Sequence, residues 1–305
     1  MGFIRGFDCK PLPTTENPLF KLLYDSIKEG NETNGIVFPA LRVNRLDFYC
    51  GGGVLLEYNG SSFKRNPAYS EEIKNKLDSE GQTSKRPISE EAYHERHAKD
   101  FMSNYSNFIN ENRYHFGKRG QPQERQYLER LYPYTYKGDS FPEVCVLDIE
   151  IRFNVDGSQK KCDMLLFNSE KSEIMFVEGK IYADDRMTCG VDDRPPKVID
   201  QITEYTNIIK KYSHTIEEQY TRYISIMSQL IFGIACEKKL KLIPAVKLLV
   251  YETPKAEDIT NKPQYRNRRN LIKKVEQAGI GSLWIETRKS HEYSLVDIWE
   301  KLRNG

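Results

Sequence analysis

Residues 161–180 read KCDMLLFNSEKSEIMFVEGK and decide how the middle of the chain folds. Two short apolar runs flank the polar segment SEKSE, a pattern typical of a β-hairpin. Because side chains alternate along a strand, we expect Glu178 and Lys180 to share one face with Ile174 and Phe176. The hairpin would therefore carry charged side chains in otherwise apolar strands.

The charged residues of this hairpin are Asp163 on the first strand and Glu178 and Lys180 on the second. Burying such ions costs several kcal/mol each unless they are paired or bound to a metal. Two convergent carboxylates form an oxygen-rich site that suits Mg²⁺ or Mn²⁺. A neighbouring lysine can stabilise charge on a phosphate or position a water. This set of residues fits metal-assisted hydrolysis of phosphodiesters.

The acidic-x-Lys triplet is not rare in a chain with 30% charged residues. It also occurs at residues 8–10, 72–74 and 237–239, where no strand-turn-strand pattern with an acidic first strand precedes it. The context therefore singles out residues 178–180. The alternative interpretation of residues 161–180 is an ordinary solvated hairpin at the edge of a sheet.

A helix is expected over residues 197–209, after the two prolines at 195 and 196. Its apolar residues recur with helical spacing. Gln201 and Tyr205 stand four residues apart and thus lie on one face of this helix. The alternative for this pair is a core tyrosine beside a solvated glutamine.

The order Asp163, Glu178-x-Lys180, Gln201-x-x-x-Tyr205 resembles the PD-(D/E)XK nuclease superfamily, in its RecB-like branch. The resemblance covers roughly residues 120–255. It implies that Asp163 and Glu178 bind a divalent metal, Mg²⁺ or Mn²⁺, and that Lys180 is the catalytic lysine. It also implies that Gln201 and Tyr205 contact nucleic acid or brace the site. The proline that often precedes the first aspartate of the family is replaced by a cysteine.

The family also carries an acidic residue ahead of the first aspartate, for which this chain offers three candidates. Glu124 lies on the apolar face of an expected helix over residues 123–132, whereas Glu129 falls on a more polar face of it. Glu150 lies on the polar side of an expected strand over residues 144–153 and is held in reserve. We favour Glu124; the alternative is that both helical glutamates form surface ion pairs.

The expected fold class is α/β (α+β), with a restriction-endonuclease-like core: a central mixed sheet flanked by helices, plus a small N-terminal β-rich region. We expect a β-meander in residues 1–60, a polar and partly helical connection in residues 61–120, and the nuclease-like domain in residues 121–305. The elements expected after the helix over 197–209 form one series. They are a second helix over residues 215–231, strands over 242–251 and 281–285, a helix near 264–277, and a last helix capped at Ser294.

A net charge of +2 gives no global attraction to nucleic acid, so local patches must supply it. Arg266, Arg268 and Arg269 are the best candidates for phosphate contacts; the alternative is a solvated basic helix face. The six cysteines form no zinc or disulfide pattern, and no iron–sulfur cluster is expected. With neither a secretory signal nor a membrane-spanning run, a cytoplasmic protein is expected.

The sequence thus favours a metal-dependent nuclease that hydrolyses phosphodiester bonds by a metal-activated water, with DNA as the favoured partner. A catalytically inactive module that binds nucleic acid or protein on the same fold is the alternative. A third possibility is a non-nuclease globular protein in which Asp163 and Lys180 form a structural ion pair. The sequence leaves open DNA or RNA, endonuclease or exonuclease, one metal or two, and a homodimer or a partner protein.

Overall fold

The computed structural model describes residues 11–29, 37–50, 53–65, 124–155, 158–187, 195–234, 237–252 and 268–305. These residues form two compact units. The C-terminal unit contains the described parts of Glu143–Glu218 and Lys239–Gly305, and the N-terminal unit contains those of residues 4–142 and Gln219–Lys238.

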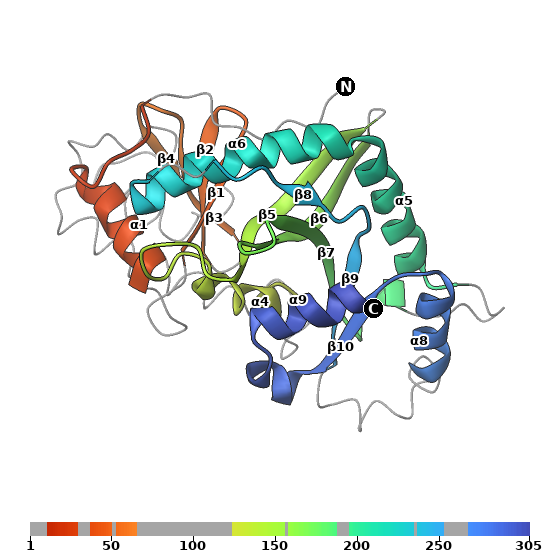
Figure 1. The fold of residues 1–305 in the computed structure, drawn as a ribbon. Helices are drawn as coiled ribbons and strands as arrows, with labels where there is room; N and C mark the ends of the chain where they lie inside the picture. Colours follow the sequence, from red (N-terminus) through yellow and green to blue (C-terminus); the bar gives the residue numbers. More distant parts are fainter. Residues whose placement is uncertain are drawn as a thin grey trace. The chain divides into compact units, whose positions relative to one another are not determined.

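The C-terminal unit is built on a mixed sheet with strand order β10-β9-β7-β6-β5, and β8 pairs with β7 (Figure 1). Strands β5, β6 and β7 form an antiparallel meander, whereas β8 and β9 run parallel to β7, and β10 runs parallel to β9. The strands are β5 (Val144–Val155), β6 (Ser158–Asn168), β7 (Glu173–Ile181), β8 (Lys241–Leu242), β9 (Lys247–Glu252) and β10 (Ser282–Glu286).

The predicted hairpin is confirmed as β6 and β7, but it does not lie at an edge. β7 pairs with β6 on one side and with β8 and β9 on the other, and its residues 173–180 are all buried. Burial on both faces is typical of a strand with parallel neighbours covered by helices. The alternative of a solvated edge hairpin is therefore wrong.

The expected strand over residues 242–251 is divided into β8 and β9. Pro244 lies in the interruption, where Ala245 N instead donates a hydrogen bond to Ile243 O at 2.8 Å. Proline has no N–H for a strand ladder, which explains the break.

Helices cover both faces of this sheet. Helix α5 (Lys197–Lys211) buries an apolar stripe, as predicted, and its Tyr205 ring packs against Phe153, which in turn packs against Phe176 of β7. Helix α9 (Leu295–Asn304) is fastened to β7 by Arg303, which forms an ion pair with Glu173. Glu173 and Phe176 stand three positions apart on β7, so their side chains point to opposite faces of the sheet. Helices α5 and α9 therefore lie on opposite faces of the sheet.

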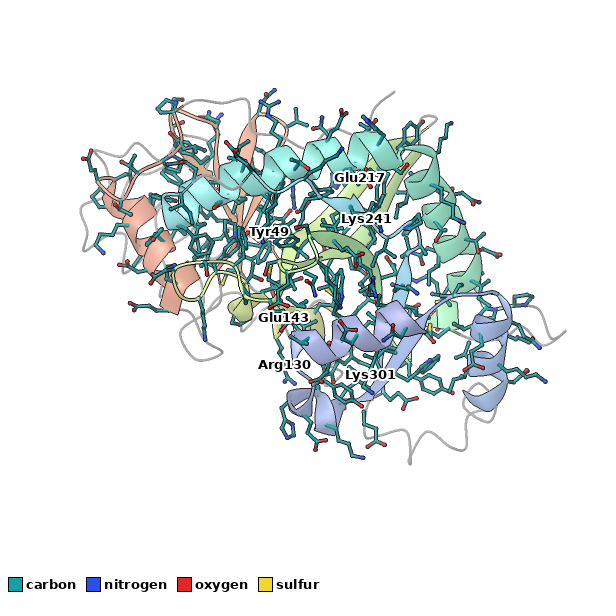
Figure 2. The ribbon with its side chains drawn as sticks, in the orientation of Figure 1. Tyr49, Arg130, Glu143, Glu217, Lys241 and Lys301 are labelled. Atoms are coloured by element: carbon teal, nitrogen blue, oxygen red, sulfur yellow. The ribbon has the colours of Figure 1, made fainter. Side chains whose placement is uncertain are left out.

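The remaining helices follow the expected order. Helix α6 (Ser213–Phe232) begins in the C-terminal unit and carries Glu217 there (Figure 2). The Glu217 carboxylate accepts a hydrogen bond from Leu242 N at 2.9 Å. Helix α8 (Arg268–Gln277) precedes β10. The predicted cap of α9 is confirmed: Ser294 Oγ accepts from Asp297 N, and Asp297 accepts from Ser294 N.

The N-terminal unit contains an antiparallel sheet with order β1-β2-β3-β4. Three strands confirm the predicted meander; β4 and the helix α1, whose Phe20 ring packs on Phe48, were not predicted. The end of α6 joins this unit, and Tyr223 accepts a hydrogen bond from Leu41 N. The elements are α1 (Pro18–Glu29), β1 (Phe38–Arg42), β2 (Arg45–Cys50), β3 (Gly53–Tyr58), β4 (Phe63–Arg65) and α4 (Glu124–Glu129).

Candidate active site

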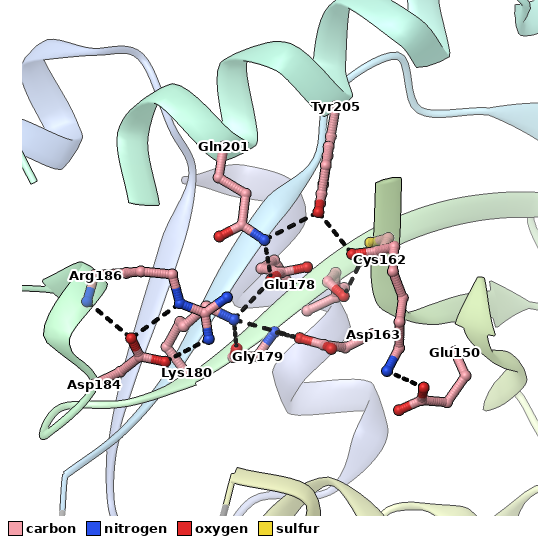
Figure 3. A network of polar contacts seen from close by, with 12 residues as sticks. Glu150, Cys162, Asp163, Glu178, Gly179, Lys180, Asp184, Arg186, Gln201 and Tyr205 are labelled. Atoms are coloured by element: carbon pink, nitrogen blue, oxygen red, sulfur yellow. Dashed lines mark hydrogen bonds and ion pairs between the residues drawn. The ribbon is translucent and has the colours of Figure 1, made fainter. Parts of the chain in front are cut away.

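Lys180 is the centre of a buried polar cluster in the C-terminal unit (Figure 3). Its Nζ donates hydrogen bonds to Glu178 Oε1 at 2.6 Å and to Gly179 O at 2.5 Å, and it lies 3.6 Å from Asp163 Oδ2. Glu178 and Lys180 are both excluded from solvent. The three predicted residues are thus brought together, and the nearer partner of the lysine is Glu178 rather than Asp163.

Asp163 projects from β6 toward the Glu178–Lys180 pair, and its Oδ2 accepts a hydrogen bond from Gly179 N at 2.8 Å. Burial raises the pKa of Asp163 above its ordinary value of 3.8, and the nearby charge of Glu150 adds to the rise. The positive charge of Lys180 and the Gly179 N–H oppose it. The folded chain therefore holds this carboxylate ionised only at a cost.

Helix α5 closes the cluster with the predicted pair. Gln201 Nε2 donates to Glu178 Oε1 at 2.7 Å and to the Tyr205 hydroxyl at 3.0 Å, and that hydroxyl donates to Lys161 O at 2.7 Å. Tyr205 is buried, as a core tyrosine would be, but Gln201 is bound to the catalytic candidate instead of being solvated. The pair therefore links α5 to both strands of the hairpin.

Glu150, the reserve candidate, lies on the neighbouring strand β5 between Ile149 and Ile151, which pair with the two residues that flank Asp163. It forms an ion pair with Lys161. Its φ of 53° is unusual for a residue with a side chain. A register shift precedes it between Val146 and Asp148. The polar side expected for the strand over residues 144–153 also includes Asp148, and there the expectation is wrong: Asp148 is fully buried and accepts a hydrogen bond from the next backbone N–H. The bulge interrupts the alternation that the prediction assumed.

Sequence reasoning missed Asp184 and Arg186, which follow β7 directly. Asp184 Oδ1 accepts from Arg186 Nε at 3.0 Å, and its Oδ2 accepts from Nη2 at 2.6 Å. Asp184 lies close enough for the charge of Lys180 to lower its pKa. The sequence does contain a signal for these two residues. It is an aspartate two positions before an arginine, just after the strand that carries the acidic-x-Lys triplet.

Among the residues that the structure describes, the other predicted site residues do not belong to this cluster. Glu124 lies in α4 of the N-terminal unit, and its role stays a prediction. Glu129, expected on the more polar face of that helix, is buried. Arg266 lies outside the described residues, and Arg268 and Arg269 begin α8 with side chains that are outside the description.

Cys162 occupies the position before the first aspartate, and its thiol donates to Val177 O at 3.4 Å. Burial, followed by the charges of Glu178 and Asp163, raises the pKa of this thiol well above 9.0. The thiol therefore stays protonated and acts as a small apolar group. Cys145 on β5 is buried in the same way.

Comparison of the chain with known proteins found no matching family model, no matching curated protein and no matching solved structure. Among the described helices, none combines the length and apolar character needed to cross a membrane.

The donor atoms of the cluster fit a hard divalent cation, although the described residues contain no group of three His, Cys, Asp or Glu side chains placed to hold one. Asp163 and Glu178 present carboxylate oxygens to the same Lys180 ammonium. Gln201 Oε1, on the side chain that binds Glu178, is a buried acceptor for which the described residues supply no hydrogen-bond donor. Oxygen donors alone select Mg²⁺ or Mn²⁺ over softer metals.

Proposed function

We propose that the C-terminal unit is a metal-dependent nuclease that hydrolyses phosphodiester bonds of nucleic acid, with DNA as the favoured substrate. The observation that carries the proposal is the buried contact of Lys180 with two carboxylates, closed by Gln201 and Tyr205. The proposal includes a restriction-endonuclease-like core, which the antiparallel β5-β6-β7 meander, the following α5 and the parallel β9 support.

Stability alone does not explain this cluster. Replacing a buried ion pair by apolar residues of similar volume is often neutral or stabilising. The raised pKa of Asp163 means that its charge is held against the preference of the folded chain. Ionisable groups that are desolvated and forced together in this way are typical of catalytic sites.

In the proposed reaction, Asp163 and Glu178 would hold Mg²⁺ or Mn²⁺, which when bound lowers the pKa of water and offsets charge on the phosphate. Lys180 contributes a positive charge fixed by Glu178 and by the Gly179 carbonyl, aimed at the negative charge that develops at phosphorus. Gln201 fixes the rotamer of Glu178 through its 2.7 Å hydrogen bond. The side chains are thus positioned before substrate binds, which reduces the reorganisation needed during reaction.

The test is cleavage of linear DNA, circular DNA and RNA in Mg²⁺, in Mn²⁺ and in EDTA. We expect metal-dependent cleavage by the wild type and its loss in Glu178→Ala and in Lys180→Met. Cleavage of circles would identify an endonuclease.

A matched control is Lys247→Met, because Lys247 is also buried in the sheet but pairs with Val177 and so points away from the Glu178 face. This variant should retain cleavage. If the wild type binds nucleic acid as well as the Glu178 and Lys180 variants do but cleaves none, the protein is a binding module and the proposal is wrong.

A further inference from the structure

The turn after β7 holds an arginine at the edge of the site. Asp184 N donates to Ile181 O at 3.0 Å, and Met187 N donates to Asp184 O at 2.9 Å, which closes the short 3₁₀ helix η4 (Asp185–Met187). Met187 is buried, and η4 contacts α5, the helix that carries Gln201. The turn is therefore fixed between the strand and the helix that build the site.

Within this turn, Asp184 orients the guanidinium of Arg186 from two directions. Its Oδ1 accepts from the backbone N of Arg186 at 2.8 Å and from Nε at 3.0 Å, while Oδ2 accepts from Nη2 at 2.6 Å. Burial alone would raise the pKa of Asp184, but the hydrogen bonds from Arg186 and the charges of Arg186 and Lys180 hold it below 3.8. Asp184 thus stays ionised and keeps the guanidinium in one plane.

The two partners differ in exposure: the Asp184 side chain is 14% exposed and the Arg186 side chain 45%. An ion pair at such exposure contributes little to stability, about 0–1 kcal/mol. A guanidinium held in a fixed plane at an acidic site is, however, well suited to a phosphate, which it can bind through two parallel hydrogen bonds.

The carboxylates around the site make an exposed cation useful for binding a phosphate there. Asp163, Glu178 and Glu150 repel an approaching phosphate. Of the two lysines that balance them, Lys180 is buried and Lys161 is held in an ion pair with Glu150. The side chain of Arg186 is more exposed than that of Lys180. Both lie on the same side of the polar cluster (Figure 3).

We propose that Arg186, oriented by Asp184, binds a backbone phosphate of the nucleic-acid strand that the site cleaves. The inference rests on the proposed nuclease function and adds a specific substrate contact to it.

The test measures DNA binding by fluorescence anisotropy in Mg²⁺ over a range of salt concentrations, in a Glu178→Gln background that keeps the DNA intact. Cleavage kinetics are measured in the otherwise wild-type chain. Arg186→Gln should raise both Kd and KM about tenfold, leave kcat nearly unchanged, and reduce the slope of log Kd against log salt by about one. Arg186→Lys should keep the slope but lose part of the affinity, since lysine cannot bind in a bidentate manner.

Asp184→Asn separates orientation from charge: it should raise KM while the salt slope stays that of the wild type. The matched control is Arg303→Gln, because Arg303 is also bound by a carboxylate through two nitrogens and is 38% exposed, but lies on the α9 face of the sheet. It should bind and cleave like the wild type.

The inference is overturned if the wild type cleaves DNA and Arg186→Gln matches Arg303→Gln in Kd, KM and salt slope; the proposed function would then stand. If the wild type neither binds nor cleaves DNA or RNA, the proposed function fails, and the inference fails with it.

Discussion

Removal of the Lys180 charge should destabilise the C-terminal unit more than most single substitutions do. Lys180→Met keeps the length of the side chain but removes the ammonium that lies 2.6 Å from Glu178 Oε1 and 3.6 Å from Asp163 Oδ2. Two carboxylates then share a desolvated space without their cation. Breaking a buried pair in this way costs about 3–5 kcal/mol, a large part of the roughly 5–15 kcal/mol that stabilises a typical folded domain.

The neutral partner variant, Glu178→Gln, keeps an acceptor for Gln201 but leaves the Lys180 ammonium with a single, more distant carboxylate. We expect it to be destabilised as well. The double variant Glu178→Gln/Lys180→Met removes both charges and should be more stable than the sum of the single effects predicts. The coupling free energy from this cycle should reach about 2–3 kcal/mol, the upper range for residues in contact.

Urea unfolding at pH 7 measures the free energy of unfolding of each protein in this double-mutant cycle. Tryptophan fluorescence is a suitable signal because it reports on the C-terminal unit. The chain has two tryptophans, Trp284 and Trp299, and both lie in the C-terminal unit. With a slope of about 3 kcal/mol per molar urea, a loss of 3–5 kcal/mol lowers the midpoint by about 1–1.7 M. If the single effects add to within about 0.5 kcal/mol, the two charges do not stabilise each other and the interpretation of a tight buried pair is wrong.

Substitutions at three further positions test the structure of the C-terminal unit. Because the pKa of Asp163 is raised in the folded chain, ionisation of Asp163 lowers the stability of the fold as pH rises from 3.8 through that raised pKa. Asp163→Asn should therefore increase the melting temperature at pH 7, and this gain should disappear below about pH 3.8. A lower melting temperature of the variant at pH 7 would contradict this sign. Tyr205→Phe leaves the acceptor Lys161 O without its donor and should cost about 1–2 kcal/mol in urea unfolding, whereas no change would show that the hydroxyl does not link α5 to β6. Gly279→Ala should cost about 1 kcal/mol because its φ is 70°, while Gly279→Asn should cost less; equal effects would argue against a left-handed backbone there.

The hairpin could be predicted because its information is local. Period-two alternation and a polar turn are sufficient to place Asp163, Glu178 and Lys180 on two adjacent strands, and helical spacing is sufficient to place Gln201 and Tyr205 on one face of α5. That the five side chains form one hydrogen-bonded cluster depends on the packing of α5 against the sheet. No local pattern specifies that packing.

The irregular features could not be predicted for a related reason. The φ of 53° at Glu150 and the bulge before it depend on how β5 pairs with β6, and glutamate has no intrinsic preference for that conformation. Asp148 is buried for the same reason. By contrast, the break at Pro244 follows from the chemistry of one residue and could have been anticipated.

Arg186 shows a different limit of sequence reasoning. A run of basic residues, such as the one that contains Arg268 and Arg269, stands out in a sequence, whereas a single arginine becomes notable only when its neighbours are known. Its ion pair with Asp184 and the contact of η4 with α5 supply that context.

Hydrolysis at this site is tested most directly by cleaving DNA in ¹⁸O-labelled water with Mn²⁺ and analysing the new terminal phosphates by mass spectrometry. We predict one ¹⁸O atom in each new phosphate from the wild type, because water supplies the attacking oxygen, and no product from Lys180→Met or Glu178→Gln. Products without the label, or labelled products formed equally well by both variants, would contradict hydrolysis by the cluster of Asp163, Glu178 and Lys180.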